Sequence, residues 1–291
     1  MYYLFNWENI SAFLNSNFTA SLSGALAGAF AGAMAAQRIA ERAKQRETIL
    51  KEIRSTNAAI MAAFNICNSG LALKNQFTKE IYDTYIATKK ALKEFKQKKD
   101  AGQQSADLPF EFQADFRTLN APVVPIDMLR SLMYEEISAS GRPLALVSTL
   151  DGVIASLADV IQKRNILIDR FRNLDKDGQK QLPAFYFGIP YDGGHISTEY
   201  SDAIESLHNL NDDVIFFSEL LVCDLTAHGK HIRDKYKKIA KVKEEKIHAV
   251  DFTELHEIGL MPDAANYTDW LKGFPNTDLQ DSTADAKKRR V

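Results

Sequence analysis

The stretch from Phe18 to Ala36 carries no charged residue, and it limits the possible folds of this chain more than any other feature. As an α-helix, these 19 residues would cover about 28 Å, which is close to the hydrocarbon thickness of a bilayer. The other apolar stretches, 144–161 and 214–225, each contain two acidic residues. We therefore predict one transmembrane helix at 18–36 and a single crossing.

The charges on either side of this span predict its orientation. Glu8 is the only charged residue before it, whereas four cations follow it closely: Arg38, Arg42, Lys44 and Arg46. Because cytoplasmic flanks carry the excess of Lys and Arg, we expect the N-terminus outside and the C-terminal part in the cytoplasm. The aromatic rings of residues 1–17 suit an external interfacial segment. A cleaved signal peptide is disfavoured, because its positive charge would precede the apolar stretch.

Glycines recur every four residues inside the span, at Gly24, Gly28 and Gly32. Glycines at this spacing let two helix backbones approach closely within a bilayer. We therefore expect the chain to form homo-oligomers through this glycine zipper. Two alternatives remain: the small residues make only a weakly apolar anchor, or the assembled helices line a pore.

Residues 37–97 contain no proline and carry apolar side chains at alternating three- and four-residue spacing, which predicts a long cytoplasmic stalk helix. Asn57 falls on the apolar seam, and Asn65 and Asn68 lie beside it. Buried asparagines can fix the register of packed helices, so this role is favoured over binding of a polar ligand. A kink is expected at Asn68-Ser69-Gly70, because glycine lowers helix propensity.

Part of this region resembles a known group of proteins. The residues that carry the resemblance are Arg54-Ser-Thr-Asn-Ala-Ala, Phe64-Asn-Ile-Cys-Asn and Leu71-Ala-Leu-Lys74. They resemble a stretch that follows the membrane span in an uncharacterised bacterial family of single-pass membrane proteins with a helical cytoplasmic region. The resemblance covers roughly residues 20–80. It implies a location in the bacterial inner membrane and brings no assigned activity.

The following residues, 98–274, are predicted to form a cytoplasmic helical bundle. Strand-like alternation is almost absent, and apolar seams follow helical spacing, so the predicted fold is all-α with coiled-coil-like packing. The expected helices run from Pro125 or Ile126 toward Ser138, from Pro143 onward, from Thr198 or Ser201 to about His248, and in short pieces within 252–274. Leu182 to Ser197 is expected to be a packed, non-helical connection, and residues 275–291 a disordered basic tail.

Arg164 interrupts the apolar seam of the helix that begins at Pro143. A guanidinium at such a position must reach the edge of the bundle or pair with an acid, because an unpaired buried charge is prohibitive. We expect a structural bridge rather than catalysis.

One helix carries a possible metal site. Asp224, His228 and His231 are spaced so that all three could project from one helical face, and such side chains can bind zinc. The spacing lacks the features of common zinc-hydrolase helices and of di-iron bundles. A hydrogen-bonded core histidine is therefore favoured for His228, and no cofactor is predicted.

The same helix continues into a basic face that includes Lys230, Arg233, Lys237 and Lys241. Such a face could contact anionic lipid or nucleic acid, but a solvated helix face is the default interpretation. Nucleic acid is disfavoured, since the whole chain has a formal net charge of -2 and Tyr236 is the only aromatic residue on this face. The expected partners are a second copy of the chain, membrane lipid and another cytoplasmic protein.

Three functions of different classes fit these features. The favoured one is a membrane-anchored, self-associating scaffold or sensor that acts through protein–protein interaction. The second is a membrane-disrupting or pore-forming effector, for example in bacterial antiphage defence. The third is a membrane-tethered, metal-dependent hydrolase that uses the possible metal site. No catalytic residue is assigned, and an enzyme is disfavoured.

Overall fold

The computed structural model describes residues 17–103, 110–240 and 246–275, and the side chains of residues 17–20 and 192 lie outside the description. These residues confirm the all-helical class: they contain no β-strand, only an isolated bridge between Tyr191 and His195. The α-helices are α2 (Asn17–Leu73), α3 (Lys79–Asp100), α4 (Ile126–Ser131), α5 (Arg142–Arg172), α6 (Lys176–Phe187), α7 (Glu199–Ala240), α8 (Thr253–Glu257) and α9 (Thr268–Gly273). Two π-helical turns, η1 (Lys74–Thr78) and η2 (Leu132–Glu136), and two 3-10 turns, η3 (Asp192–Gly194) and η4 (Ala264–Tyr267), complete the set.

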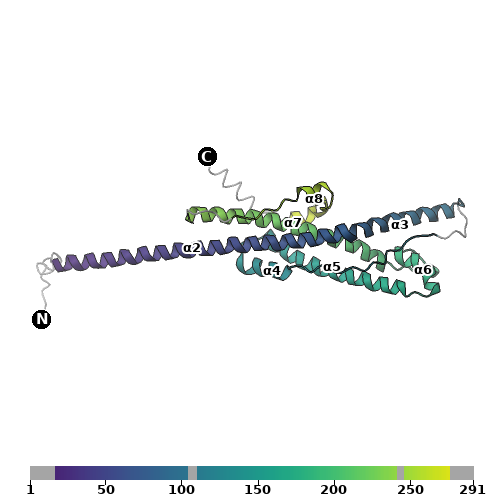
Figure 1. Ribbon diagram of the computed structural model, residues 1–291, viewed down its shortest axis with the longest axis horizontal. Coiled ribbons are helices and arrows are strands. Elements are labelled where there is room, and N and C mark those ends of the chain that lie inside the picture. Colours follow the sequence, from purple (N-terminus) through teal and green to yellow (C-terminus); the bar gives the residue numbers. More distant parts are fainter. Residues whose placement is uncertain (1–16, 104–109, 241–245, 276–291) are drawn as a thin grey trace, which may run out of the picture.

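The longest element is a rod formed by α2, η1 and α3, which runs from one end of the molecule to the other (Figure 1). Other helices pack against only part of this rod. The second half of α2 packs against α7, whereas its first half projects beyond the other helices (Figure 1). Most of the predicted stalk at 37–97 is therefore packed into the helical body and is not an isolated linker helix.

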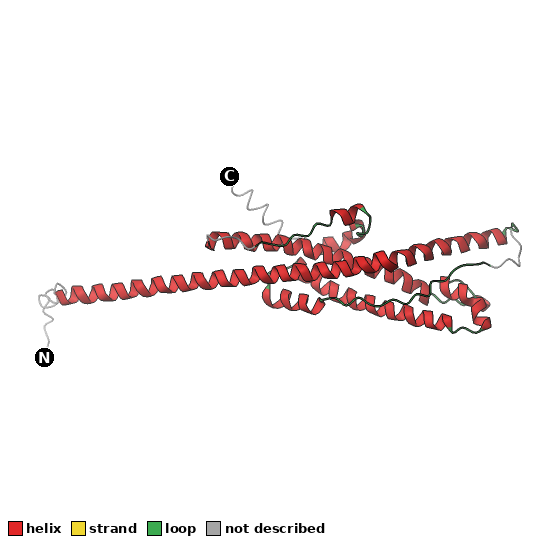
Figure 2. Ribbon diagram, viewed as in Figure 1, coloured by secondary structure: helices red, strands yellow, loops and turns green. Residues whose placement is uncertain are grey.

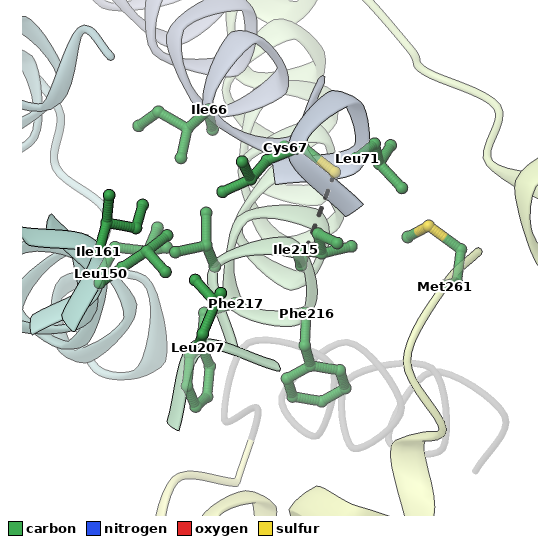
Figure 3. Packing of buried hydrophobic residues seen from close by; sticks show 14 of the residues in the cluster. Ile66, Cys67, Leu71, Leu150, Ile161, Leu207, Ile215, Phe216, Phe217 and Met261 are labelled. Carbon is green, nitrogen blue, oxygen red and sulfur yellow. Dashed lines mark hydrogen bonds between the residues drawn. The ribbon is translucent and has the colours of Figure 1, made fainter. Parts of the chain in front are cut away.

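The body is a bundle of helices (Figure 2), in which α7 packs against both α2 and α5. Helix α5 begins as its sequence predicts, with a proline in the first turn and Gly141 at a φ of 68° immediately before it. The core is a continuous cluster of apolar side chains from all three helices. Near the C-terminal end of α2 it includes Ile66, Cys67 and Leu71, and Ile215 of α7 lies next to Cys67 (Figure 3).

Gly70 does not kink the rod. Helix α2 continues as an α-helix to Leu73, and the irregular turn comes later, at η1. A β-carbon at Gly70 would lie 2.9 Å from Ile215 Cγ1, so this glycine permits the close approach of α2 and α7. Cys67 Sγ donates to the Ile215 carbonyl at 3.8 Å in the same place (Figure 3).

The prediction of a non-helical connection at 182–197 is wrong for its first third. Helix α6 includes Pro183 and ends at Phe187. Asp175 caps its start by accepting a hydrogen bond from the Gly178 amide at 2.8 Å, and Gly188 ends it at a φ of 66°. These two capping residues were the sequence signs of a helix, and the proline concealed them.

The C-terminal segment returns along the body. Phe252 packs against Phe64 of α2, and Tyr267 stacks on Phe216 of α7 with ring centroids 3.7 Å apart. Trp270 contacts Phe217. The short helices expected in 252–274 are present, and residues 276–291 of the predicted tail at 275–291 lie outside the described residues.

Among the described helices, one, α5, is long and apolar enough to cross a bilayer by length and composition. Asp151 and Asp159 do not disqualify it, contrary to the prediction that no other segment competes with 18–36. In the fold, however, α5 places Leu150, Leu157 and Ile161 in the core against α7. The core helix of a soluble protein passes the same test of length and composition, so this test alone is weak evidence that α5 crosses a membrane. The first side chains of the predicted span, at 18–20, lie outside the described residues.

Candidate functional site

The free part of α2 is the most distinctive surface of the molecule. Every described side chain from residue 21 to residue 48 is exposed. Up to Ala36 this surface is uncharged, and it includes large apolar side chains such as Phe30, which is 68% exposed. A continuous apolar surface of this kind marks a site of contact with a membrane or a protein.

The free helix has two different faces. The large face consists of Leu22, Leu26, Phe30 and Met34, which recur every four residues and are all exposed. The glycine face consists of Gly24, Gly28 and Gly32, and a β-carbon on any of them would meet nothing within 4 Å. The two series are offset by two residues, which is about 200° around the helix. One face is therefore bulky and the opposite face is flat.

A polar junction lies where this helix enters the body. Glu52 of α2 accepts hydrogen bonds from the amide and the hydroxyl of Ser138, and its Oε1 lies 3.1 Å from His228 Nε2 of α7. The bond with His228, supported by Ser138, lowers the pKa of Glu52 to about 2 despite partial burial. Glu136 accepts from the Ser55 hydroxyl beside it. The junction ties α2, α7 and the segment before α5 together.

The structure directs the three residues of the possible metal site to different places. Asp224 accepts two hydrogen bonds from Arg142, at 2.8 and 2.6 Å, and His228 contacts Glu52 instead. His231 is exposed. In the part of the chain that is described, no group of three His, Cys, Asp or Glu side chains could hold a metal ion. The described residues therefore give no support to the predicted metal-dependent hydrolase.

Comparison with known proteins adds no identity. No family model, curated protein or solved structure matches this chain. The bacterial family suggested by residues 54–74 therefore stays a prediction, and function must be inferred from the geometry.

The asparagines of the predicted polar seam have separate surroundings. Asn57 is half-buried, and its side chain donates to the Lys246 carbonyl at 2.9 Å and accepts from the His248 amide at 3.0 Å. It thus holds the returning C-terminal segment against α2. Asn65 and Asn68 are exposed.

Arg164 is completely buried. Its Nη1 donates to the Arg117 carbonyl at 2.7 Å, and its Nη2 lies 4.0 Å from Asp115 Oδ1. Both partners belong to the extended segment 110–125 that runs along α5. Arg164 therefore holds this segment against the bundle mainly through its hydrogen bond to the Arg117 carbonyl.

The basic face lies on the last turns of α7. Lys230 and Lys237 are exposed, Arg233 is half-buried, and Lys241 lies outside the described residues. Arg46 of α2 donates from Nη2 to the Ile239 carbonyl at 3.0 Å. This face therefore lies next to the cations that follow the span.

Two features of the body escaped sequence reasoning. Lys74 of η1 forms a buried ion pair with Asp212 of α7 at 2.7 Å, and Asn211 beside it donates to the Gly70 carbonyl. A cavity of about 300 Å³ lies between α5, α6 and α7, lined by Phe171, Tyr200 and other residues. Both depend on contacts between distant helices. The only sequence sign of the first was the polar run 74–76 inside an apolar pattern.

Proposed function

We propose that this chain is a membrane-anchored, self-associating helical scaffold or sensor that acts through protein–protein interaction. The observation that carries the proposal is the free half of α2, whose described side chains from residue 21 to residue 48 are all exposed and are uncharged up to Ala36. Water is a poor environment for this surface. Burying apolar surface contributes roughly 25 cal/mol per Å², so a bilayer around 18–36 stabilises the helix strongly.

The two faces of the free helix support assembly in the bilayer. Lipid tails fill the spaces around Leu26 and Phe30 on the large face equally well in a monomer and an oligomer. The glycine face offers a flat surface on which a second helix backbone packs closely, and this packing drives association in lipid. Because the glycines recur every four residues, the stripe winds around the helix and favours a right-handed crossing.

The body supports a role in binding rather than in chemistry. Its polar groups pair with one another across helices, as in the Arg142–Asp224 and Lys74–Asp212 pairs. Such pairs hold the helices of the body in one arrangement. Assembly in the membrane would then bring several copies of this body side by side. A scaffold or sensor of this kind presents repeated docking surfaces to a cytoplasmic partner.

Chemical crosslinking of the full-length protein in native membranes tests the proposal. Gly28→Leu places bulk on the glycine face and should reduce the crosslinked oligomers about tenfold, since each 1.4 kcal/mol of lost packing is a factor of ten. Ala33→Leu is the matched control. It adds similar bulk five residues later, about 140° from Gly28, where the large face lies.

Two results would reject the proposal. A wild-type protein that is strictly monomeric after crosslinking removes self-association. Extraction of the wild-type protein from membranes by alkaline carbonate removes the anchor. Equal effects of Gly28→Leu and Ala33→Leu would show that association does not use the glycine face.

A further inference from the structure

We infer that α7 and the part of α2 that follows the span form one basic collar, which binds anionic lipid headgroups of the cytoplasmic leaflet. The collar consists of Arg38, Arg42, Lys44 and Arg46 of α2 with Lys230, Arg233, Lys235, Lys237 and Lys238 of α7. This inference rests on the proposed function, because it requires residues 18–36 to lie in the bilayer.

The two halves of the collar are far apart in the sequence and adjacent in the structure. Arg46 bonds to the carbonyl of Ile239 in the last turn of α7. The same isoleucine lines a groove of about 380 Å³ together with five residues of α2: Glu41, Lys44, Gln45, Thr48 and Ile49. Ala240, the last described residue of α7, is buried. The end of α7 is therefore fixed beside the first turns of α2 that follow the uncharged stretch (Figure 1).

This position brings the collar close to a membrane surface. Gln45 follows Ala36 by nine positions, which corresponds to about 14 Å along the helix axis. The headgroup layer occupies about 6 Å of this distance on each side of a bilayer. The remaining distance is about one Debye length at physiological salt, so the lipid charges are felt at the end of α7.

The charge of the collar matches an anionic surface. Nine cations face three carboxylates within 38–47 and 230–240: Glu41, Glu47 and Asp234. Asp234 lies 3.4 Å from Arg233 and 3.6 Å from Lys237, so it offsets charge within α7. All four α2 cations are exposed, as are Lys235 and Lys238. Lysines near a helix end also complement the helix dipole, but that effect does not explain the cations of α2 at the same level.

The experiment compares lipid compositions with the full-length chain in nanodiscs. One set of discs contains phosphatidylcholine alone, and the other contains phosphatidylcholine and phosphatidylglycerol at roughly three to one. Hydrogen exchange is measured at the amides of 230–240. Each lysine at an anionic surface contributes about 1 kcal/mol to binding, and one Debye length of screening reduces this to about a third, so three lysines together contribute about fivefold. Exchange should slow by about this factor in the anionic discs and return to the neutral-disc rate in about 1 M salt.

Three triple variants decide whether the collar is responsible. Replacing Lys235, Lys237 and Lys238 by Gln should abolish the effect of anionic lipid, and replacing the same three by Arg should retain it. Replacing Lys90, Lys93 and Lys96 by Gln is the matched control. These exposed lysines of α3 lie roughly 80 to 90 Å along the rod from Ala36, so their loss should change nothing.

The results separate the collar from the anchor. A wild-type chain that enters the discs but exchanges equally in both compositions overturns the collar alone. A chain that fails to enter the discs overturns the proposed function. The collar is also rejected if inorganic phosphate or a DNA duplex slows exchange equally in neutral discs, or if the α3 variant behaves like the α7 variant.

Discussion

The ion pair between Arg142 and Asp224 offers the most quantitative test of the folded body. Arg142 Nε and Nη2 donate to the two carboxylate oxygens of Asp224 at 2.8 and 2.6 Å. The two side chains are only 13% and 5% exposed. Asp224→Asn keeps the shape of the side chain and removes its charge, which leaves the guanidinium of Arg142 buried without a counterion.

The expected cost follows from this burial. Removing one partner of a buried ion pair destabilises a protein by about 3–5 kcal/mol. Because asparagine keeps one acceptor for the guanidinium, we expect the lower end, about 3 kcal/mol. For a domain of this size, each kcal/mol lowers Tm by about 2–4 °C, so Asp224→Asn should lower Tm by about 6–12 °C.

Two controls isolate the effect of burial. Asp151→Asn removes an acid that lies 3.3 Å from Arg130, but these side chains are 43% and 46% exposed. It should cost less than about 1 kcal/mol. The double variant Arg142→Met with Asp224→Leu removes both charges and should recover most of the lost stability.

Thermal unfolding of the full-length protein in detergent, followed by circular dichroism, measures these differences. Equal Tm values for Asp224→Asn and wild type would refute the stabilising role of the pair. A double variant that loses as much as the two single changes together would show that burial of an unpaired charge is not the cause.

Three further predictions concern single side chains. The pKa of Glu52 lies near 2 instead of its ordinary 4.5, so its contribution to stability should disappear as pH falls between these values, and Glu52→Gln should flatten that part of a plot of unfolding free energy against pH. Burial raises the pKa of Cys67 to about 12, so a thiol reagent near neutral pH should modify only exposed Cys223 in the folded protein. In denaturant it should modify both cysteines. Two rapid modifications without denaturant would contradict the packing of Cys67. Gly70→Ala should destabilise by about 1 kcal/mol or more through its clash with α7, whereas Gly152→Ala on open α5 surface should stabilise by up to about 1 kcal/mol, and equal signs in chemical denaturation would refute the close approach.

The sequence was sufficient to predict the class of fold and several helix boundaries. The proline in the first turn of α5 and the continuous seam of α7 are local features, and the observed helices begin at or within a residue or two of the predicted positions. The described part of α7 reaches Ala240, and residues 246–248, which the prediction included in this helix, are not helical. Local patterns carry this information because helix periodicity and capping depend on near neighbours.

The contacts between helices could not be predicted in the same way. Nothing near Glu52 in the sequence indicates Ser138 or His228, which reach it only when α2, the segment after η2 and α7 pack together. The same is true of Gly70, whose role depends on Ile215 of α7 rather than on helix propensity. The spacing of Asp224 and His228 suggested a metal site because the sequence shows only that they share a helix face. Their actual partners, Arg142 and Glu52, lie on other helices.

The orientation of the chain across the membrane is the central claim, and cysteine accessibility tests it directly. The exposed Gln103 precedes α5 and the native Cys223 follows it. In intact bacterial cells that produce the full-length protein with Gln103→Cys, a membrane-impermeant thiol reagent should label neither residue until the inner membrane is opened, while an N-terminal tag is reached from outside. Labelling of both cysteines in intact cells would contradict the predicted orientation. Labelling of only one of the two would contradict the single crossing and indicate that α5 also crosses.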